Sequence, residues 1–130
     1  MDLSVDLSFG SPIVRVVGDM RLWGKQEVSD QIRDTLHNLM LRGQRRIVVN
    51  MTGVTRIDSR GIGCLARCHA TAITSNSEIA LVLQPGMVLD VLRQVNFIRL
   101  YPVFPTEEAA LAAQGASASK PTATTAPPRQ

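Results

Sequence analysis

Asp58 and Ser59 are the residues whose types and position best suit chemistry, because they stand directly before a segment with a helical pattern. A serine hydroxyl at a helix start lies near backbone N–H groups that have no partner inside the helix. A phosphate added there would meet the positive end of the helix dipole and would bring about −1.5 to −2 charge at neutral pH. We therefore expect the fold to tolerate that phosphate, and a partner fitted against the neutral hydroxyl to reject it. The alternative is that Asp58 and Ser59 form an ordinary helix cap. For Asp58 this capping role is compatible with a role in the switch.

The other reactive side chains do not indicate an enzyme. Cys64 and Cys68 are four residues apart on one predicted helix, a poor arrangement for a disulfide, and we expect them to be small, buried or half-buried apolar residues. A zinc site with His69 would need further ligands at useful spacing, and none stand there. The sequence has no phosphate-binding loop, dinucleotide fingerprint or Gly-x-Ser-x-Gly elbow. We predict a protein without catalytic residues, metal or cofactor.

Hydrophobic periodicity gives the elements that must position Ser59. Strands are expected at residues 3–9, 13–17, 47–49, 79–83 and 100–104. Helices are expected at about 25–41, from Ser59 or Gly61 to about 75, at 87–95 and at 106–111. A loop is expected to begin at Thr52-Gly53. The short turn at 10–12 permits only an antiparallel hairpin, whereas the later alternation of strands and helices implies parallel pairing. The predicted fold is a single α/β domain with a mostly parallel sheet of about five strands, an antiparallel first strand and about four helices.

Length and charge restrict the class of protein further. The 130 residues suit one domain, expected at 1–114, followed at 115–130 by an Ala, Ser, Thr and Pro tail that we expect to be disordered. The formal net charge is +3, but Lys120 and Arg129 belong to the tail, so the body is nearly neutral and no nucleic-acid surface is expected. No signal peptide or membrane-spanning apolar run is visible, which predicts a cytoplasmic protein without direct membrane insertion.

The segment Thr55-Arg56-Ile57-Asp58-Ser59-Arg60-Gly61-Ile62-Gly63 resembles the signature of the STAS domain family, the sulphate-transporter and anti-sigma-factor-antagonist module. The family pattern is Asp, Ser or Thr, a small polar residue, Gly, an apolar residue and Gly. Asp58, Ser59, Gly61, Ile62 and Gly63 match this pattern, and Arg60 departs from it. The expected order of strands and helices resembles the family over residues 3–113, and Gly18-Asp19 stands where the family often has Gly and an acidic residue.

The resemblance implies a phosphoregulated binding module of the anti-sigma factor antagonist type. In such proteins the serine after the aspartate is phosphorylated by the partner, an anti-sigma factor with serine kinase activity, and the unphosphorylated form binds that partner. By position Ser59 is that serine, and a serine phosphatase is a further partner class. The oligomeric state is not specified. The residues expected to bind the partner are Asp19, Arg21, Trp23, Asp58, Ser59, Arg60, Gly61, Ile62 and Gly63.

Some of these residues have a second interpretation. Asp19, Arg21 and Trp23 follow a predicted strand and should lie at the Ser59 end of the sheet, but they could equally form a solvated loop with one packed Trp. Gly61 and Gly63 would keep the helix start thin for a close approach. Arg60 could pair with a phosphate on Ser59 or with an acidic partner residue, or it could mark a divergent member that is never phosphorylated.

Two other functions remain open on the sequence. The domain could be a constitutive scaffold, either in a stress-signalling complex or as the soluble subunit of a lipid or anion transporter. It could also bind a nucleotide or another small ligand at the strand ends, as other doubly wound folds do, although it lacks a phosphate loop.

Overall fold

The computed structural model of the chain describes residues 2–19 and 26–119. The strands are β1 (Asp2–Asp6), β2 (Ile13–Asp19), β3 (Arg46–Arg56), β4 (Glu78–Val82) and β5 (Val103–Phe104). The helices are α1 (Gln26–Leu41), α2 (Ser59–Thr74), α3 (Met87–Gln94), the short 3-10 helix η2 (Phe97–Arg99) and α4 (Glu107–Ser119).

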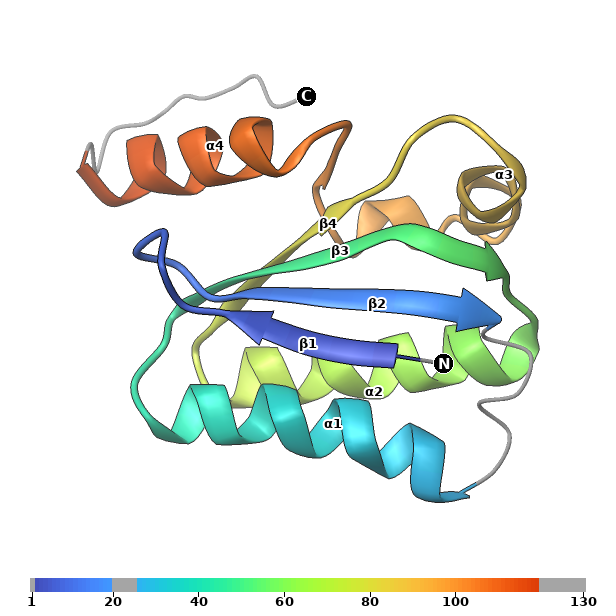
Figure 1. The fold of residues 1–130 in the computed structure, drawn as a ribbon, viewed down its shortest axis with the longest axis horizontal. Helices are drawn as coiled ribbons and strands as arrows, with labels where there is room; N and C mark the ends of the chain where they lie inside the picture. The colour runs from blue at the N-terminus through green and yellow to red at the C-terminus, as the bar shows by residue number, and fades with distance from the viewer. Residues whose placement is uncertain (1, 20–25, 120–130) are drawn as a thin grey trace.

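The strands form one sheet in the order β1-β2-β3-β4-β5. β1 pairs antiparallel with β2, as the short turn at Gly10-Ser11-Pro12 requires, and every other pair is parallel. Helices α1 and α2 lie side by side on one face of the sheet, and α4 lies across the other face (Figure 1). The predicted α/β fold, with its antiparallel first strand, is therefore confirmed.

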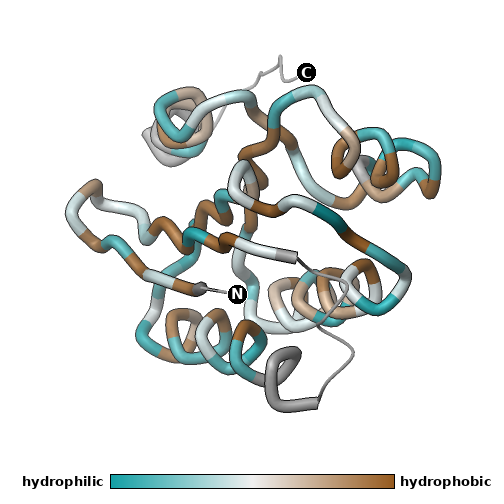
Figure 2. The backbone as a smooth tube through the Cα atoms, turned by 45° about the vertical axis from the view of Figure 1, so that its right-hand side comes forward, coloured by the Kyte–Doolittle hydropathy of each residue, from teal (hydrophilic) through white to brown (hydrophobic). Residues whose placement is uncertain are grey.

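The core consists of two apolar clusters, one on each face of the sheet. Side chains alternate along a strand, so in β2 Val14 faces the cluster under α1 and α2, whereas Ile13 faces the smaller cluster under α4. In β3 Val49 and Val48 divide in the same way. Figure 2 shows hydrophobic positions along the central strands and hydrophobic positions alternating with hydrophilic ones along the helices. Burial on both faces accounts for the continuous β-branched sequence of the inner strands.

Strand β3 is much longer than the predicted strand at 47–49, and the loop expected from Thr52 is wrong. The cause is β2, which continues beside it and pairs Val17 with Gly53 and Asp19 with Arg56. Gly53 fits this crowded pairing because a Cβ atom there would stand 2.8 Å from Val17 Cγ2. The prediction failed because the polar residues and the glycine in this part of the strand are not typical of a strand. The pairing with β2 comes from the tertiary structure and leaves no local signal in the sequence.

The C-terminal part also differs from the prediction in its boundaries. The strand expected at 100–104 is only Val103–Phe104, and the preceding residues form η2. Tyr101 is buried between them, where its hydroxyl donates a 2.6 Å hydrogen bond to the carbonyl oxygen of Leu65 in α2. Helix α4 continues to Ser119, past the expected domain end at 114, because alanine-rich sequence propagates a helix well. Residues 120–130 lie outside the described residues.

Candidate functional site

The Ser59 region stands at the edge of the sheet where β2 and β3 end. Asp19, the last residue of β2, pairs with Arg56, the last residue of β3, and α2 begins at Ser59 shortly after. The backbone of Asp19 therefore lies beside the end of β3, as the parallel pairing predicts, and Figure 1 shows both strands ending near the start of α2. Arg21 and Trp23 lie outside the described residues.

Asp58 is the N-cap of α2. Its backbone is extended (φ −128°, ψ −171°), and its Oδ1 accepts hydrogen bonds from the backbone N–H groups of Arg60 at 3.0 Å and Gly61 at 3.2 Å. A cap of this kind stabilises a helix by about 1 kcal/mol. The capping role that the sequence left open for the Asp58-Ser59 pair thus belongs to Asp58.

Ser59 is the first residue of α2 and is exposed to solvent. Because Asp58 supplies the cap, the Ser59 hydroxyl is not needed to begin the helix. The backbone N–H groups expected to be free near Ser59 are not all free, since those of Arg60 and Gly61 are already bonded to Asp58. A phosphate on Ser59 would find those two donors occupied, and it would stand next to the Asp58 carboxylate rather than alone in the field of the helix.

The next residues of α2 divide between the interior and the surface. Gly61 is buried, so its small size serves the packing of the domain itself. Ile62 is half-buried and packs against the larger core cluster. Gly63 differs, because a Cβ atom added there would have no heavy atom within 4 Å outside its own local helix backbone. Of the two glycines expected to keep the helix start thin, Gly63 alone leaves open space on the outside.

Two arginines flank this helix start in the sequence. Arg56 and Arg60 are exposed on either side of the Asp58-Ser59 pair, and the first turn of α2 contains no acidic residue. The site therefore offers an exposed hydroxyl, two exposed arginines that are near it in the sequence, and one carboxylate that is engaged in capping. Among the described residues, no three His, Cys, Asp or Glu side chains are grouped so as to hold a metal ion.

A model of the STAS domain family matches residues 12–110, which include the whole Asp58–Gly63 motif. The chain belongs to the STAS domain family. A comparison with curated proteins finds no match.

Solved structures with the same fold include the anti-sigma factor antagonist SpoIIAA in its unphosphorylated form, at 15% identity and a TM-score of 0.63 over 88% of this chain and 97% of that chain. An anti-sigma factor antagonist from Mycobacterium paratuberculosis is 16% identical, with a TM-score of 0.72 over 86% of this chain and 92% of its own. The Bacillus cell fate determinant SpoIIAA in its phosphorylated form is 17% identical, with a TM-score of 0.62 over 85% and 97%. At these identities the likeness shows that this STAS domain has the fold of anti-sigma factor antagonists.

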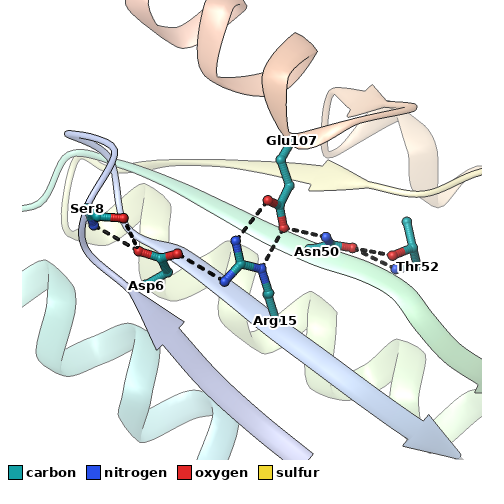
Figure 3. Close-up of polar contacts among 6 residues, drawn as sticks. All are labelled: Asp6, Ser8, Arg15, Asn50, Thr52 and Glu107. Carbon is teal, nitrogen blue, oxygen red and sulfur yellow. Dashed lines mark hydrogen bonds and ion pairs between the residues drawn. The ribbon is translucent and has the colours of Figure 1, made fainter.

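A second polar cluster in this STAS domain lies under α4 and was not expected from the sequence. Figure 3 shows Arg15 of β2 between two carboxylates, with Nε and one terminal nitrogen donating to Glu107 at 2.8 and 2.9 Å and the other terminal nitrogen donating to Asp6 at 3.1 Å. Asn50 of β3 donates to the same Glu107 carboxylate at 2.5 Å. The cluster joins the hairpin, β3 and the first turn of α4, so we assign it a structural role.

The charges in this cluster shift its ionisation. The hydrogen bonds from Arg15 and then from Asn50 lower the pKa of Glu107, against the opposing effect of burial. The pKa of Asp6 is also lowered, first by hydrogen bonds from Ser8 and then by Arg15. The sequence contained one signal, a lone arginine within the apolar segment 13–17, but nothing that paired it with a residue so far along the chain.

The cysteines and the aromatic residues of this domain are engaged in the core. Cys64 and Cys68 are buried free thiols, and their mutual hydrogen bond followed by burial raises the pKa of Cys68, so it stays protonated at neutral pH. Burial likewise raises the pKa of Tyr101. His69 packs edge-on against Tyr101 with ring centroids 5.1 Å apart.

None of the helices among the described residues combines the length and apolar character needed to cross a membrane.

Proposed function

We propose that this STAS domain is an anti-sigma factor antagonist, that it binds its partner through the edge of the sheet around Ser59, and that phosphorylation of Ser59 ends this binding. The observation that carries the proposal is the exposure of Ser59 at the first position of α2, directly after an aspartate that caps the helix. The hydroxyl is accessible, and the fold does not depend on it.

The chemistry of the switch follows from that position. A phosphate would place about −1.5 to −2 charge on the surface at neutral pH. Because Asp58 already holds the first amides of α2, the phosphate would project outward beside a carboxylate instead of being drawn into the helix end. Charge and bulk would then enter any interface that fits the neutral hydroxyl, while the cap and the core remain as they are. That SpoIIAA, which shares this fold, has been solved in both unphosphorylated and phosphorylated forms supports the idea.

The partner in this proposal is an anti-sigma factor with serine kinase activity, which supplies the catalysis and uses Ser59 as its substrate. A serine phosphatase would restore the binding form. These reactions take place in the cytoplasm, where we place the protein. The domain itself performs no reaction.

The experiment is phosphorylation in vitro with the candidate anti-sigma factor kinases of the source organism, read by intact-mass and peptide mass spectrometry. We expect one phosphate on the wild type and on Thr55→Ala, and none on Ser59→Ala. Thr55 is a matched control because it also exposes a hydroxyl at the end of β3. Phosphate on Ser59→Ala at the level of the wild type would show that the site assignment is wrong.

Arg60 favours a second candidate, a constitutive scaffold whose surface is never phosphorylated, because a long cation replaces the small polar residue of the family pattern. Binding of the partner to Ser59→Asp and Ser59→Ala separates the two functions. Loss of binding with Asp alone supports the switch, and equal binding of both variants supports the scaffold.

A further inference from the structure

The exposed face of α2 carries positive charge and no negative charge. The helix has 16 residues, of which Arg60 and Arg67 are exposed cations and none is Asp or Glu. The two arginines are separated by two helical turns, or about 10 Å along the axis, and so lie on one face.

Neither arginine forms an ion pair within the described part of the chain. Arg15 and Arg46, by contrast, do form ion pairs. The acidic residue that precedes α2 is Asp58, and its Oδ1 already accepts hydrogen bonds from the backbone N–H groups of Arg60 and Gly61. Arg56, also exposed, ends β3 and pairs in register with Asp19 of β2, so it is not counted with the α2 arginines. The exposed face of α2 is therefore basic, although the body of the protein is nearly neutral.

The space between Arg60 and Arg67 is open to another protein. Gly63 has no neighbour where a Cβ would stand, and Ala66 and Ala70 are exposed small residues of the same helix. Ile73 follows toward the end of α2 with 66% of its surface exposed. A helix face with small residues between two cations lets a second backbone come close while acidic side chains reach the guanidinium groups.

We propose, resting on the function proposed above, that the partner which recognises Ser59 places an acidic surface along α2, with carboxylates paired to Arg60 and Arg67. Charge complementarity is the argument for a partner of this kind. A nucleic acid fits less well, because phosphate-backbone binding needs many cations, and α2 offers two together with small residues and no Phe, Tyr or Trp side chain for stacking. Its one imidazole, His69, is half-buried against Tyr101.

This arrangement gives Arg60 a part in the switch. In the unphosphorylated protein its guanidinium is available to a carboxylate of the partner. A phosphate on the adjacent Ser59 would attract the same guanidinium and would repel that carboxylate. The one residue that departs from the family pattern would then make binding more sensitive to phosphorylation.

The test uses the full chain and the anti-sigma factor that binds the wild type, with affinity measured by calorimetry for Arg60→Glu, Arg67→Glu and Arg42→Glu. Arg42 is the matched control, because it is also exposed but follows α1 near the amino end of β3, away from Ser59. We expect each α2 variant to lose about tenfold or more in affinity at low salt and Arg42→Glu to lose less than twofold. Raising the NaCl concentration to about 0.5 M should lower the affinity of the wild type for the anti-sigma factor, because salt screens exposed charge pairs. The differences in affinity between the wild type and the α2 variants should then become smaller.

The possible results distinguish a failure of this inference from a failure of the proposed function. If the wild type binds and phosphorylation of Ser59 weakens binding, while both α2 variants bind like Arg42→Glu, the function stands and the acidic partner surface is refuted. If no candidate anti-sigma factor binds the wild type, both are refuted. A DNA duplex that binds as tightly as the anti-sigma factor, and is released by the same variants, would refute the inference in favour of a nucleic-acid partner. Thermal unfolding of every variant shows whether a loss of affinity comes from a loss of fold.

Discussion

Replacing Gly63 with alanine should make the domain more stable and the complex with its partner weaker. In the free protein the added methyl group meets no heavy atom within 4 Å outside its local helix backbone, so it introduces no clash. Glycine inside a helix is less favourable than alanine by about 0.5–1 kcal/mol, because its unfolded chain has more freedom to lose. The free energy of unfolding of Gly63→Ala should therefore rise by about that amount, or a few degrees in Tm.

The same methyl group acts in the opposite direction at the partner interface. If another chain packs closely against α2 beside Ser59, one extra methyl group in a well-packed contact costs about 1–3 kcal/mol. The affinity for the partner should then fall by about tenfold or more. The assays are urea or thermal unfolding of the free protein and calorimetry of the complex.

Gly43→Ala is the control for this prediction. Gly43 likewise has open space where a Cβ would stand, but its φ of +87° lies in the left-handed region, so alanine there should destabilise the fold and leave partner binding unchanged. A lower Tm for Gly63→Ala would refute the local geometry of α2. A higher Tm with unchanged affinity would refute the close approach of a partner at Gly63.

Three further predictions concern the scaffold. Asp58→Ala should lower the free energy of unfolding by about 1 kcal/mol through loss of the α2 cap, whereas Asp58→Asn should keep most of it; urea unfolding measures both. Glu107→Gln should destabilise the domain at neutral pH. Because the pKa of Glu107 is lowered in the folded state, the stabilisation that its carboxylate provides is lost as the pH falls. The free energies of unfolding of the wild type and the variant should therefore differ at neutral pH and converge at about pH 3, and a constant difference would contradict the ion-pair account. Tyr101→Phe removes the buried hydrogen bond to Leu65 and should cost about 1 kcal/mol, read by thermal unfolding, with no effect on partner affinity.

The sequence predicted the order of elements because that order depends on local patterns. The apolar β-branched residues at 47–49 and 79–83 indicated buried strands, and the short turn at 10–12 required an antiparallel hairpin. The three- and four-residue spacing of Ile32, Leu36 and Leu39 indicated the buried face of α1. These signals lie within a few residues of one another and do not depend on the rest of the chain.

Features that depend on distant residues could not be predicted in this way. The carboxyl half of β3 pairs with β2 although its own sequence resembles a loop. The Arg15-Glu107 ion pair joins two residues that are 92 positions apart in the chain. The Ser59 site could be predicted from the sequence only in part. Its motif identified Ser59 and Asp58, but only the structure separated the cap from the exposed hydroxyl and the buried Gly61 from the open Gly63.

The most direct measurement is the affinity of one anti-sigma factor for three forms of this protein: unmodified, phosphorylated on Ser59, and dephosphorylated again by a serine phosphatase. Circular dichroism of each form reports whether the fold is retained. We predict tight binding by the first and third forms, at least a tenfold loss in the second, and the same spectrum for all three. Equal affinity of the phosphorylated form, or unfolding of the domain by the phosphate, would contradict the account.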